Sequence, residues 1–175
     1  MSKNHPILNI ADVELKGSPV PLPPRLEKKY AGAKMGFIGS VVGAQKLGYN
    51  LTVVPPGKRA FPRHAHRVNE EMFFVVSGTG EVRIGDETFP IREGDVIANP
   101  PGGAESAHQI INTGTIELRY LAVSTKLSPE IVEYPDSKKF GVAAEIVGAD
   151  GKKDLFRFIG RAGESVPYYD GEPED

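Results

Sequence analysis

Residues 57–78 read GKRAFPRHAHRVNEEMFFVVSG, and this stretch decides which fold and which chemistry we expect. His64 and His66 are separated by one residue, so in an extended chain both imidazoles point to the same face. Glu71 then begins an apolar run that ends at Gly78. Two imidazoles and a carboxylate on one face can begin a site for a divalent metal ion.

A third histidine, His108, lies in a second strand-like run, AHQIIN at 107–112. The chain has only four histidines, and three of them fall in these two stretches, which is the main reason to expect metal chemistry. Glu70 competes with Glu71 for the role of the carboxylate. Strand alternation places the two on opposite faces, and the spacing to Gly78 favours Glu71.

Composition and charge exclude several classes of protein. The 21 basic and 23 acidic residues give a net charge of -2, and no basic block is dense enough to indicate a nucleic-acid partner. The chain has no cysteine, which excludes disulfides, thiolate ligands and thiol catalysis. Its beginning shows no apolar leader, and no apolar run approaches the roughly 20 residues that span a bilayer. We therefore expect a cytoplasmic protein with no membrane partner.

Turn residues punctuate the chain at short intervals. With 20 glycines and 15 prolines spread through 175 residues, short strands are favoured over long helices, as in an all-β sandwich or barrel. Strands are expected at 36–42, 48–54, 71–77, 81–84, 87–91, 95–98, 108–112 and 116–124. Further strands could form at 142–147 and 155–159, whereas 129–134 is expected to be a loop.

These segments divide the chain into three parts. Residues 1–35 form an irregular N-terminal arm with a short helical turn at 25–29, residues 36–125 form the barrel, and residues 126–175 form a C-terminal extension. The extension packs on the barrel or on a partner subunit. In the strand 71–77 both faces are apolar apart from Glu71, so something packs outside it as well as inside. We expect a homodimer, with the arm or the C-terminal segment helping to cover the interface.

The two histidine stretches resemble the two sequence motifs of the cupin superfamily. The first motif matches at Gly57, His64, His66, Glu71 and Gly78. The second motif matches at Gly94, Pro100, Gly102, His108 and Asn112. The chain departs from the family pattern by a longer loop between Gly102 and His108, which affects the placement of that histidine.

The resemblance implies a double-stranded β-helix, also called a jelly roll or cupin barrel. It implies one divalent transition metal, which could be Fe, Mn, Ni, Co or Zn, with the ligands His64, His66, Glu71 and His108. Three imidazoles and one carboxylate leave open positions on a six-coordinate ion, and open positions suit catalysis or anion capture.

Three further segments resemble a bacterial subgroup of small single-domain cupins. They are YLAVST at 120–125, YPD at 134–136 and DGEP at 170–173. Members of this subgroup are often provisionally labelled sugar-phosphate isomerases. The resemblance thus implies a metal-dependent enzyme that acts on a small polar metabolite. The alternatives are a non-catalytic module that binds a metal or small ligand, an Fe(II) dioxygenase, and a structural dimer module with an incidental metal.

Few side chains beyond the metal ligands point to catalysis. Glu105 precedes His108 and could act as a general base, or it could be a solvated loop residue. Tyr120 could face the cavity as an acid or belong to the core. The arginines Arg63, Arg67 and Arg83 could hold a phosphate or carboxylate at the barrel mouth, or they could lie on a solvated face.

Overall fold

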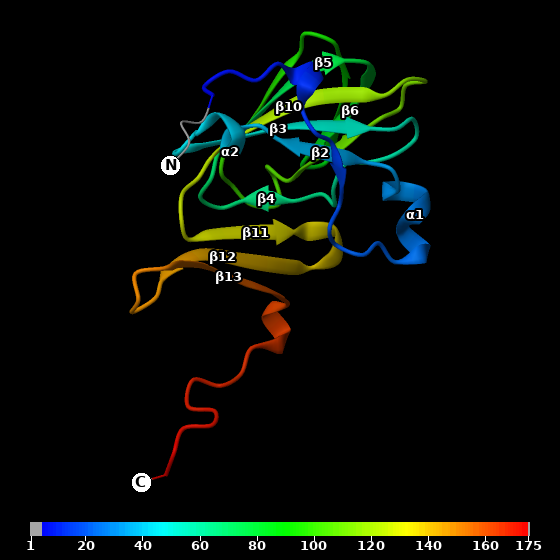
Figure 1. The fold of residues 1–175 in the computed structure, drawn as a ribbon. Helices are drawn as coiled ribbons and strands as arrows, with labels where there is room; N and C mark the ends of the chain where they lie inside the picture. The colour runs from blue at the N-terminus through cyan, green and yellow to red at the C-terminus, as the bar shows by residue number, and fades with distance from the viewer. Residues whose placement is uncertain (1–4, 175) are drawn as a thin grey trace.

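The computed structural model describes residues 5–174, so the first residues of the predicted arm and the last residue of the predicted extension lie outside the described part. Its strands form three antiparallel sheets (Figure 1). The first sheet has the order β1 (Lys16–Gly17), β2 (Lys34–Phe37), β3 (Leu47–Val54), β10 (Leu118–Thr125), β5 (Glu71–Ser77) and β8 (Val96–Asn99). The second has the order β7 (Glu87–Arg92), β6 (Thr79–Ile84) and β9 (His108–Ile111). The third has the order β13 (Lys153–Gly160), β12 (Lys139–Val147), β11 (Glu130–Tyr134) and β4 (Ala65–His66).

The helical segments are short. They are α1 (Pro24–Tyr30), α2 (Gly39–Val42) and the 3-10 turns Ile10–Asp12, Pro135–Ser137 and Ala162–Glu164. None of the helices in the described part of the chain is long and apolar enough to cross a membrane. The helix α1 agrees with the helical turn predicted at 25–29.

The first two sheets face each other across one apolar core. Strand β5 shows the alternation: Phe73 and Val75 point inward and are 5% and 0% exposed, respectively. They pack in one buried cluster with Val82 of β6 and Ile110 of β9, which belong to the opposite sheet. Each such side chain stabilises the fold by about 1.5–3 kcal/mol on burial. The predicted all-β fold, a double-stranded β-helix, is confirmed.

The N-terminal arm covers part of the outer face of the barrel. Val13 of the arm and Ile38 pack with Leu51 of β3, and Val76 on the outer face of β5 lies against this second cluster. Near the start of β5, Met72 remains 36% exposed. The predicted outer cover of β5 is therefore present over one end of the strand only.

Two sequence predictions were wrong. The strand expected at 36–42 ends at Phe37, because residues 39–42 turn into α2, which Gly43 terminates in the left-handed conformation at φ 82°. The loop expected at 129–134 is strand β11. Its formation depends on pairing with β4, which lies 66 positions earlier at the closest register pair, Val132 with His66. The remaining predicted strands are confirmed, with ends shifted by a few residues.

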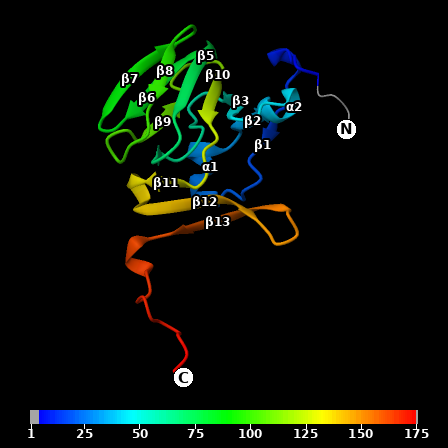
Figure 2. The ribbon, with the colours of Figure 1, turned by 90° about the vertical axis from the view of Figure 1, so that its left-hand side faces the viewer.

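The C-terminal strands β11, β12 and β13 form a layer beneath the barrel, which we call the shelf (Figures 1 and 2). Strand β11 joins this shelf to the barrel through β4, and β12 and β13 follow outward in order. Beyond β13 the chain leads away from the body of the protein towards the C-terminus (Figure 2). The shelf thus reaches the barrel of its own chain at the strand that holds His66.

Candidate metal centre

One backbone pairing and the spacing along the chain bring the three predicted histidines together. His64 and His108 face each other in an antiparallel bridge, in which each backbone N–H donates to the carbonyl of the other, at 3.1 and 2.8 Å. His66 follows on the same face of the chain, as the one-residue spacing predicts. Glu71 lies at the start of β5. The loop between Gly102 and His108, although longer than in the family pattern, does not displace His108 from this group.

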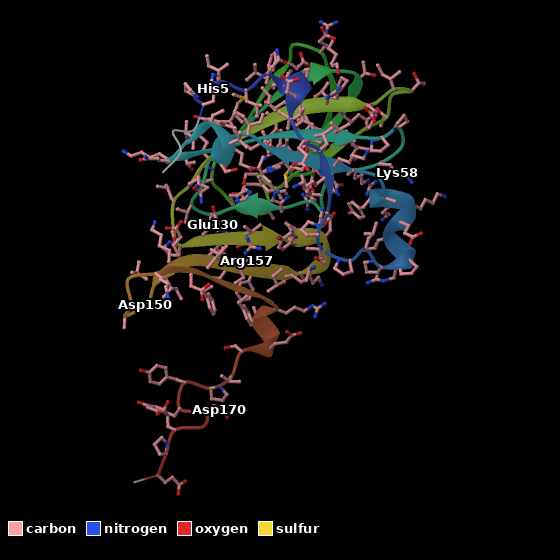
Figure 3. All side chains as sticks on the ribbon, in the orientation of Figure 1. His5, Lys58, Glu130, Asp150, Arg157 and Asp170 are labelled. Atoms are coloured by element: carbon pink, nitrogen blue, oxygen red, sulfur yellow. The ribbon has the colours of Figure 1, made fainter. Side chains whose placement is uncertain are left out.

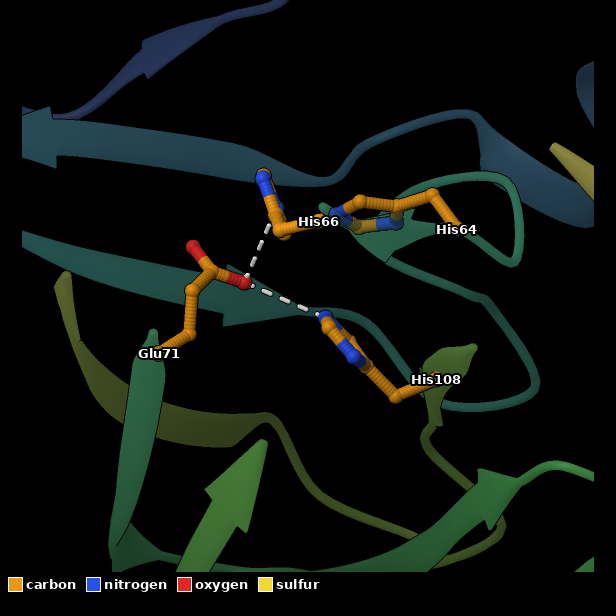
Figure 4. Close-up of side chains that lie close together, drawn as sticks. All are labelled: His64, His66, Glu71 and His108. Carbon is orange, nitrogen blue, oxygen red and sulfur yellow. Dashed lines mark hydrogen bonds and ion pairs between the residues drawn. The ribbon is translucent and has the colours of Figure 1, made fainter. Parts of the chain in front are cut away.

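The four side chains converge on a common point (Figure 4). Each of His64, His66, Glu71 and His108 offers one ligand atom, and these atoms all lie within 4.8 Å of one another. Glu71 Oε2 lies 3.1 Å from Nε2 of His108 and 3.4 Å from Nε2 of His66. Glu70, the competing carboxylate, is exposed and does not belong to the group.

The outer ring nitrogens of the histidines are anchored away from this point. Nδ1 of His64 lies 2.9 Å from the carbonyl oxygen of Pro62, and Nδ1 of His108 lies 3.3 Å from that of Ser106. Nδ1 of His66 lies 3.4 Å from a carboxylate oxygen of Glu130. Acceptors at Nδ1 fix the tautomer that leaves Nε2 free as a ligand, which is the usual arrangement around protein-bound metals.

The residues present fit a divalent transition metal. Nε2 of His66 is buried and makes no hydrogen bond to any described residue, although it points at the carboxylate of Glu71. A buried polar atom without a partner is costly, and a metal ion would satisfy it. Mixed imidazole and carboxylate ligands suit Fe, Mn, Co, Ni or Zn. The cluster could therefore hold such an ion.

The protonation states of His64 and Glu71 favour the binding of a cation. Burial, together with the neighbouring His108 and His66, lowers the pKa of His64 to about 4. Burial alone would raise the pKa of Glu71, but the neighbouring imidazoles of His108 and His66 outweigh the effect of burial and lower this pKa below its usual range. At neutral pH the group thus offers a neutral His64 and an ionised carboxylate, the forms that bind metals.

Burial also opposes protonation of His66, yet its pKa is raised, because the carboxylates of Glu71 and Glu130 outweigh the effect of burial. A bound cation would compete with that proton, since imidazole binds metals only in its neutral form.

Glu130 is a residue that the sequence did not reveal. It lies on β11, between the barrel and the rest of the shelf (Figure 3), and is 8% exposed. Besides His66, its carboxylate accepts hydrogen bonds from the backbone N–H groups of Val68 and Asn69, at 3.2 and 3.0 Å, and from the side chain of Asn69. It thereby holds the segment that joins the histidine pair to β5. No local pattern marks it, because its partners lie some 60 positions earlier.

The space around the cluster is small on its inner side. A cavity of about 10 Å³, roughly the volume of one water molecule, lies beneath His64 and His108 and is closed by Phe73 and Tyr120. On the other side His66 and Glu71 are 18% and 16% exposed, so the cluster meets solvent there. Any ligand therefore reaches it from the surface.

The two predicted catalytic residues lie in different surroundings, and neither belongs to the cluster. Glu105 is exposed on its loop, and its carboxylate accepts a hydrogen bond of 2.7 Å from the backbone N–H of Gly103, which lowers the pKa of Glu105. Tyr120 is 2% exposed and packs against Phe73, and burial raises its pKa above the usual range. Tyr120 lines the small cavity beside the histidines.

Another tyrosine, which the sequence reading missed, lies near the cluster. The ring of Tyr134, at the end of β11, has its centroid 6.2 Å from that of His64. It also borders a second cavity of about 490 Å³ between the shelf and the loop of Ala104, where Lys138 and Lys139 contribute to the lining. Strand β11 forms through pairing with β4, so no local sequence pattern predicts that Tyr134 lies beside His64.

The arginines considered as anion ligands are held in ion pairs. Arg63 is 7% exposed, and its Nε donates to Asp136 at 3.0 Å. Arg83 lies 3.4 Å from the same carboxylate. Arg67 pairs with Glu133 at 2.6 Å. Their positive charge is therefore largely compensated within the chain.

Comparison with known proteins relates this site to a family. The sequence profile described as "Cupin domain" matches residues 50–124, which contain all four residues of the cluster. Among curated proteins, the protein SchB of Streptomyces halstedii is 32% identical over 99 residues, which cover 57% of this chain and 61% of SchB. The chain spans only 54 to 61% of the length of the first curated relatives it matches.

Solved structures resemble the chain more completely. A sugar phosphate isomerase from a cupin superfamily, from Silicibacter pomeroyi, is 25% identical and superposes with a TM-score of 0.74 over 91% of this chain and 95% of that chain. A protein of Acidithiobacillus ferrooxidans, provisionally named a sugar phosphate isomerase, is 30% identical with a TM-score of 0.58 over 70% of this chain and 76% of that chain.

Proposed function

The chain belongs to the cupin superfamily, and from this premise we propose that it is a metal-dependent enzyme that acts on a small polar metabolite, in the manner of a sugar-phosphate isomerase. The observation that supports a metal is the convergence of three histidines and Glu71 within 4.8 Å. A divalent ion bound by His64, His66, Glu71 and His108 would supply Lewis acidity towards neighbouring oxygen atoms of a substrate.

The shape of the site limits the size of that substrate. The inner cavity of about 10 Å³ leaves no room beneath the histidines, so a substrate lies on the partly exposed side of His66 and Glu71. A metabolite with adjacent hydroxyl and carbonyl oxygens is small enough and presents both oxygens to one ion.

Isomerisation moves a proton between neighbouring carbon atoms, so groups that exchange protons are needed near the ion. We propose Tyr134 as the proton donor: its ring centroid lies 6.2 Å from that of His64, and burial raises its pKa, so the phenol is protonated at neutral pH. Glu105, whose pKa is lowered by the hydrogen bond from Gly103, is ionised and remains the predicted base. We propose Tyr134 rather than Tyr120 as the acid, because Tyr120 lies in the core.

The similarity to the Silicibacter pomeroyi structure supports the isomerase proposal beyond the shared barrel. It extends over 91% of this chain and therefore includes much of the shelf from which Glu130 and Tyr134 approach the histidines.

Metal content per chain tests the proposal most directly. Untagged protein purified without chelator is analysed by mass spectrometry, beside His108→Ala and His5→Ala. His5 is exposed and lies outside the cluster, so it is the matched control. We expect about one equivalent of a single transition metal, lost in His108→Ala and kept in His5→Ala. Wild-type protein that neither contains a metal nor takes one up on titration would contradict the proposed enzyme.

A second candidate is a non-catalytic module that binds a metal or a small ligand. The nearly filled interior beneath the histidines favours it, since many enzymes enclose more of their substrate. Incubation of metal-loaded protein with aldose phosphates in D₂O separates the two. An isomerase incorporates deuterium at the carbon beside the carbonyl, visible by NMR, whereas a binding module does not. If the bound metal proves to be iron, consumption of dioxygen tests the dioxygenase alternative.

A further inference from the structure

Asn99, the last residue of β8, is a buried amide without a partner. It is 3% exposed, and neither its Oδ1 nor its Nδ2 makes a hydrogen bond to any described residue. Within residues 5–174, only His66 shares this property, through the Nε2 that faces Glu71. Two unpaired polar atoms on one buried side chain are costly to stability.

Strand register places this amide beside the candidate metal centre. Asn99 is the direct partner of Glu71 in the antiparallel pair of β8 and β5. Directly opposed residues point to the same face, with Cβ atoms about 4.5–5.5 Å apart. Ile97, two positions earlier on the same face of β8, belongs to the core between the sheets. The side chain of Asn99 therefore faces inward, next to the carboxylate that faces the histidines.

The amide is chemically selective in what it accepts. It offers a donor at Nδ2 and an acceptor at Oδ1. A phosphate or carboxylate oxygen only accepts hydrogen bonds and would leave Oδ1 unpaired, whereas a hydroxyl group donates and accepts at once. A leucine of similar volume would fill the same space without the cost of unpaired polar atoms.

We propose that Asn99 binds a hydroxyl group of the substrate, namely the hydroxyl next to the carbonyl in an aldose phosphate or a related hydroxy-carbonyl compound. The inference rests on the proposed function and sharpens it, since it names the part of the substrate that lies beside Glu71. Asn99 is a positioning and specificity residue: it orients the hydroxyl and moves no proton.

The test compares Asn99→Leu with the wild type for three quantities: metal content, the urea midpoint of unfolding, and affinity for matched sugars. The probes are aldose phosphates of five and six carbons, each beside its 2-deoxy counterpart, titrated into metal-loaded protein. We expect the wild type to bind the hydroxylated member at least about tenfold more tightly. In Asn99→Leu this preference disappears, metal content is unchanged, and the urea midpoint rises. Asn99→Ser, which keeps a donor and an acceptor, retains part of the preference.

Asn112→Leu is the matched control for stability. Asn112 is also a buried asparagine, but its amide donates to Val54 and Ile116 at 2.7 and 2.8 Å, and its oxygen accepts from Gly114 at 2.9 Å. Its replacement is expected to lower the urea midpoint.

Three results would overturn the inference while leaving the proposed function intact. The first is that Asn99→Leu keeps the preference for the hydroxylated sugar. The second is that the urea midpoint of Asn99→Leu falls, as that of Asn112→Leu is expected to. The third is that Asn99→Leu loses bound metal, which would make Asn99 a metal ligand. A wild type that binds metal but no aldose phosphate overturns it as well. Absence of metal from the wild type itself is the separate failure of the proposed function.

Discussion

The carboxylate of Glu130 lies 3.4 Å from Nδ1 of His66, although the two residues are separated by 64 positions in the chain. This contact ties the C-terminal shelf to the candidate metal centre, because it orients the imidazole and leaves its Nε2 for a ligand. It also gives β11 a role in the site that its position in the sequence does not suggest.

Glu130→Gln is therefore expected to weaken metal affinity by about 10- to 100-fold, the usual effect of losing the carboxylate behind a ligating histidine. Competition with a chromophoric chelator measures the change. Glu133→Gln is the matched control on the same strand, since Glu133 pairs with Arg67 and is not one of the four clustered residues. Equal affinities in wild type and Glu130→Gln would contradict this role.

Adjacent carboxylates offer a second comparison. Glu71 lies within the cluster, whereas Glu70 is exposed. We expect Glu71→Gln to lose bound metal and Glu70→Gln to keep about one equivalent, measured by mass spectrometry on protein purified without chelator. Loss of metal in Glu70→Gln alone would show that the strand register assigned to β5 is wrong.

The local part of the site was readable from the sequence, because it depends on strand alternation. His64 and His66 share a face by spacing alone, and Glu71 follows from the length of strand to Gly78. Gly78 closes that strand at φ 87°, where an added Cβ would lie 2.6 Å from the carbonyl oxygen of Glu117. A glycine at this position was therefore a sound marker of the strand end.

The residues of the site that come from distant parts of the chain could not be predicted from the sequence in this way. Glu130 and Tyr134 reach the histidines only because β11 pairs with β4, and a single sequence contains no local signal for pairing across more than sixty residues. Asn99 was missed for a related reason, since its partner Glu71 is set by the register of β5 with β8.

Stability of the metal-free protein should fall as the pH is lowered from about 6.5 to about 4. The pKa of His64 is lowered to about 4 in the folded protein, so between these values the unfolded chain binds the additional proton. The loss amounts to about 2–3 kcal/mol at most. His66 changes stability little within this window, because its raised pKa places its contribution above the window. Glu71 adds to the fall in the lower part of the window, because its pKa is lowered in the folded protein while the unfolded chain protonates this carboxylate near its ordinary value of 4.5.

Urea unfolding of chelator-treated protein at several pH values measures this slope. His64→Gln is expected to flatten it, and His5→Gln, which changes an exposed histidine outside the cluster, is expected to keep it. A slope in His64→Gln as steep as in the wild type would assign the acid sensitivity to other groups.

If the protein is an isomerase, Tyr134→Phe and Glu105→Gln should lower kcat, each by about 10²- to 10⁴-fold, since both side chains are proposed to transfer protons. Tyr120→Phe keeps the ring that packs against Phe73 and serves as the control. Deuterium exchange in metal-loaded protein gives the rates. A large effect of Tyr120→Phe with none for Tyr134→Phe would return the role of acid to Tyr120.

The predicted homodimer should use the outer hairpin of the shelf. Every residue of β13 before Gly160 is exposed, and Phe156 and Phe158 are 47% and 48% exposed. With Leu155 and Ile159, these side chains present apolar area on the order of several hundred Å². A standard interface buries about 800 Å² on each partner, so β13 would supply part of such an interface. A second copy packed on β13 would bury its exposed apolar side chains.

Light scattering coupled to size-exclusion chromatography measures the molar mass of the protein in solution. We expect twice the mass of one chain. Phe156→Glu combined with Phe158→Glu should give a monomer that still binds metal, because the hairpin contributes nothing to the cluster. Val96→Glu is the control: Val96 is 66% exposed on the barrel itself, outside the arm's cover. If Val96→Glu dissociates the dimer and the double change Phe156→Glu and Phe158→Glu does not, the interface lies on the uncovered face of β8. A monomeric wild type would contradict the predicted dimer.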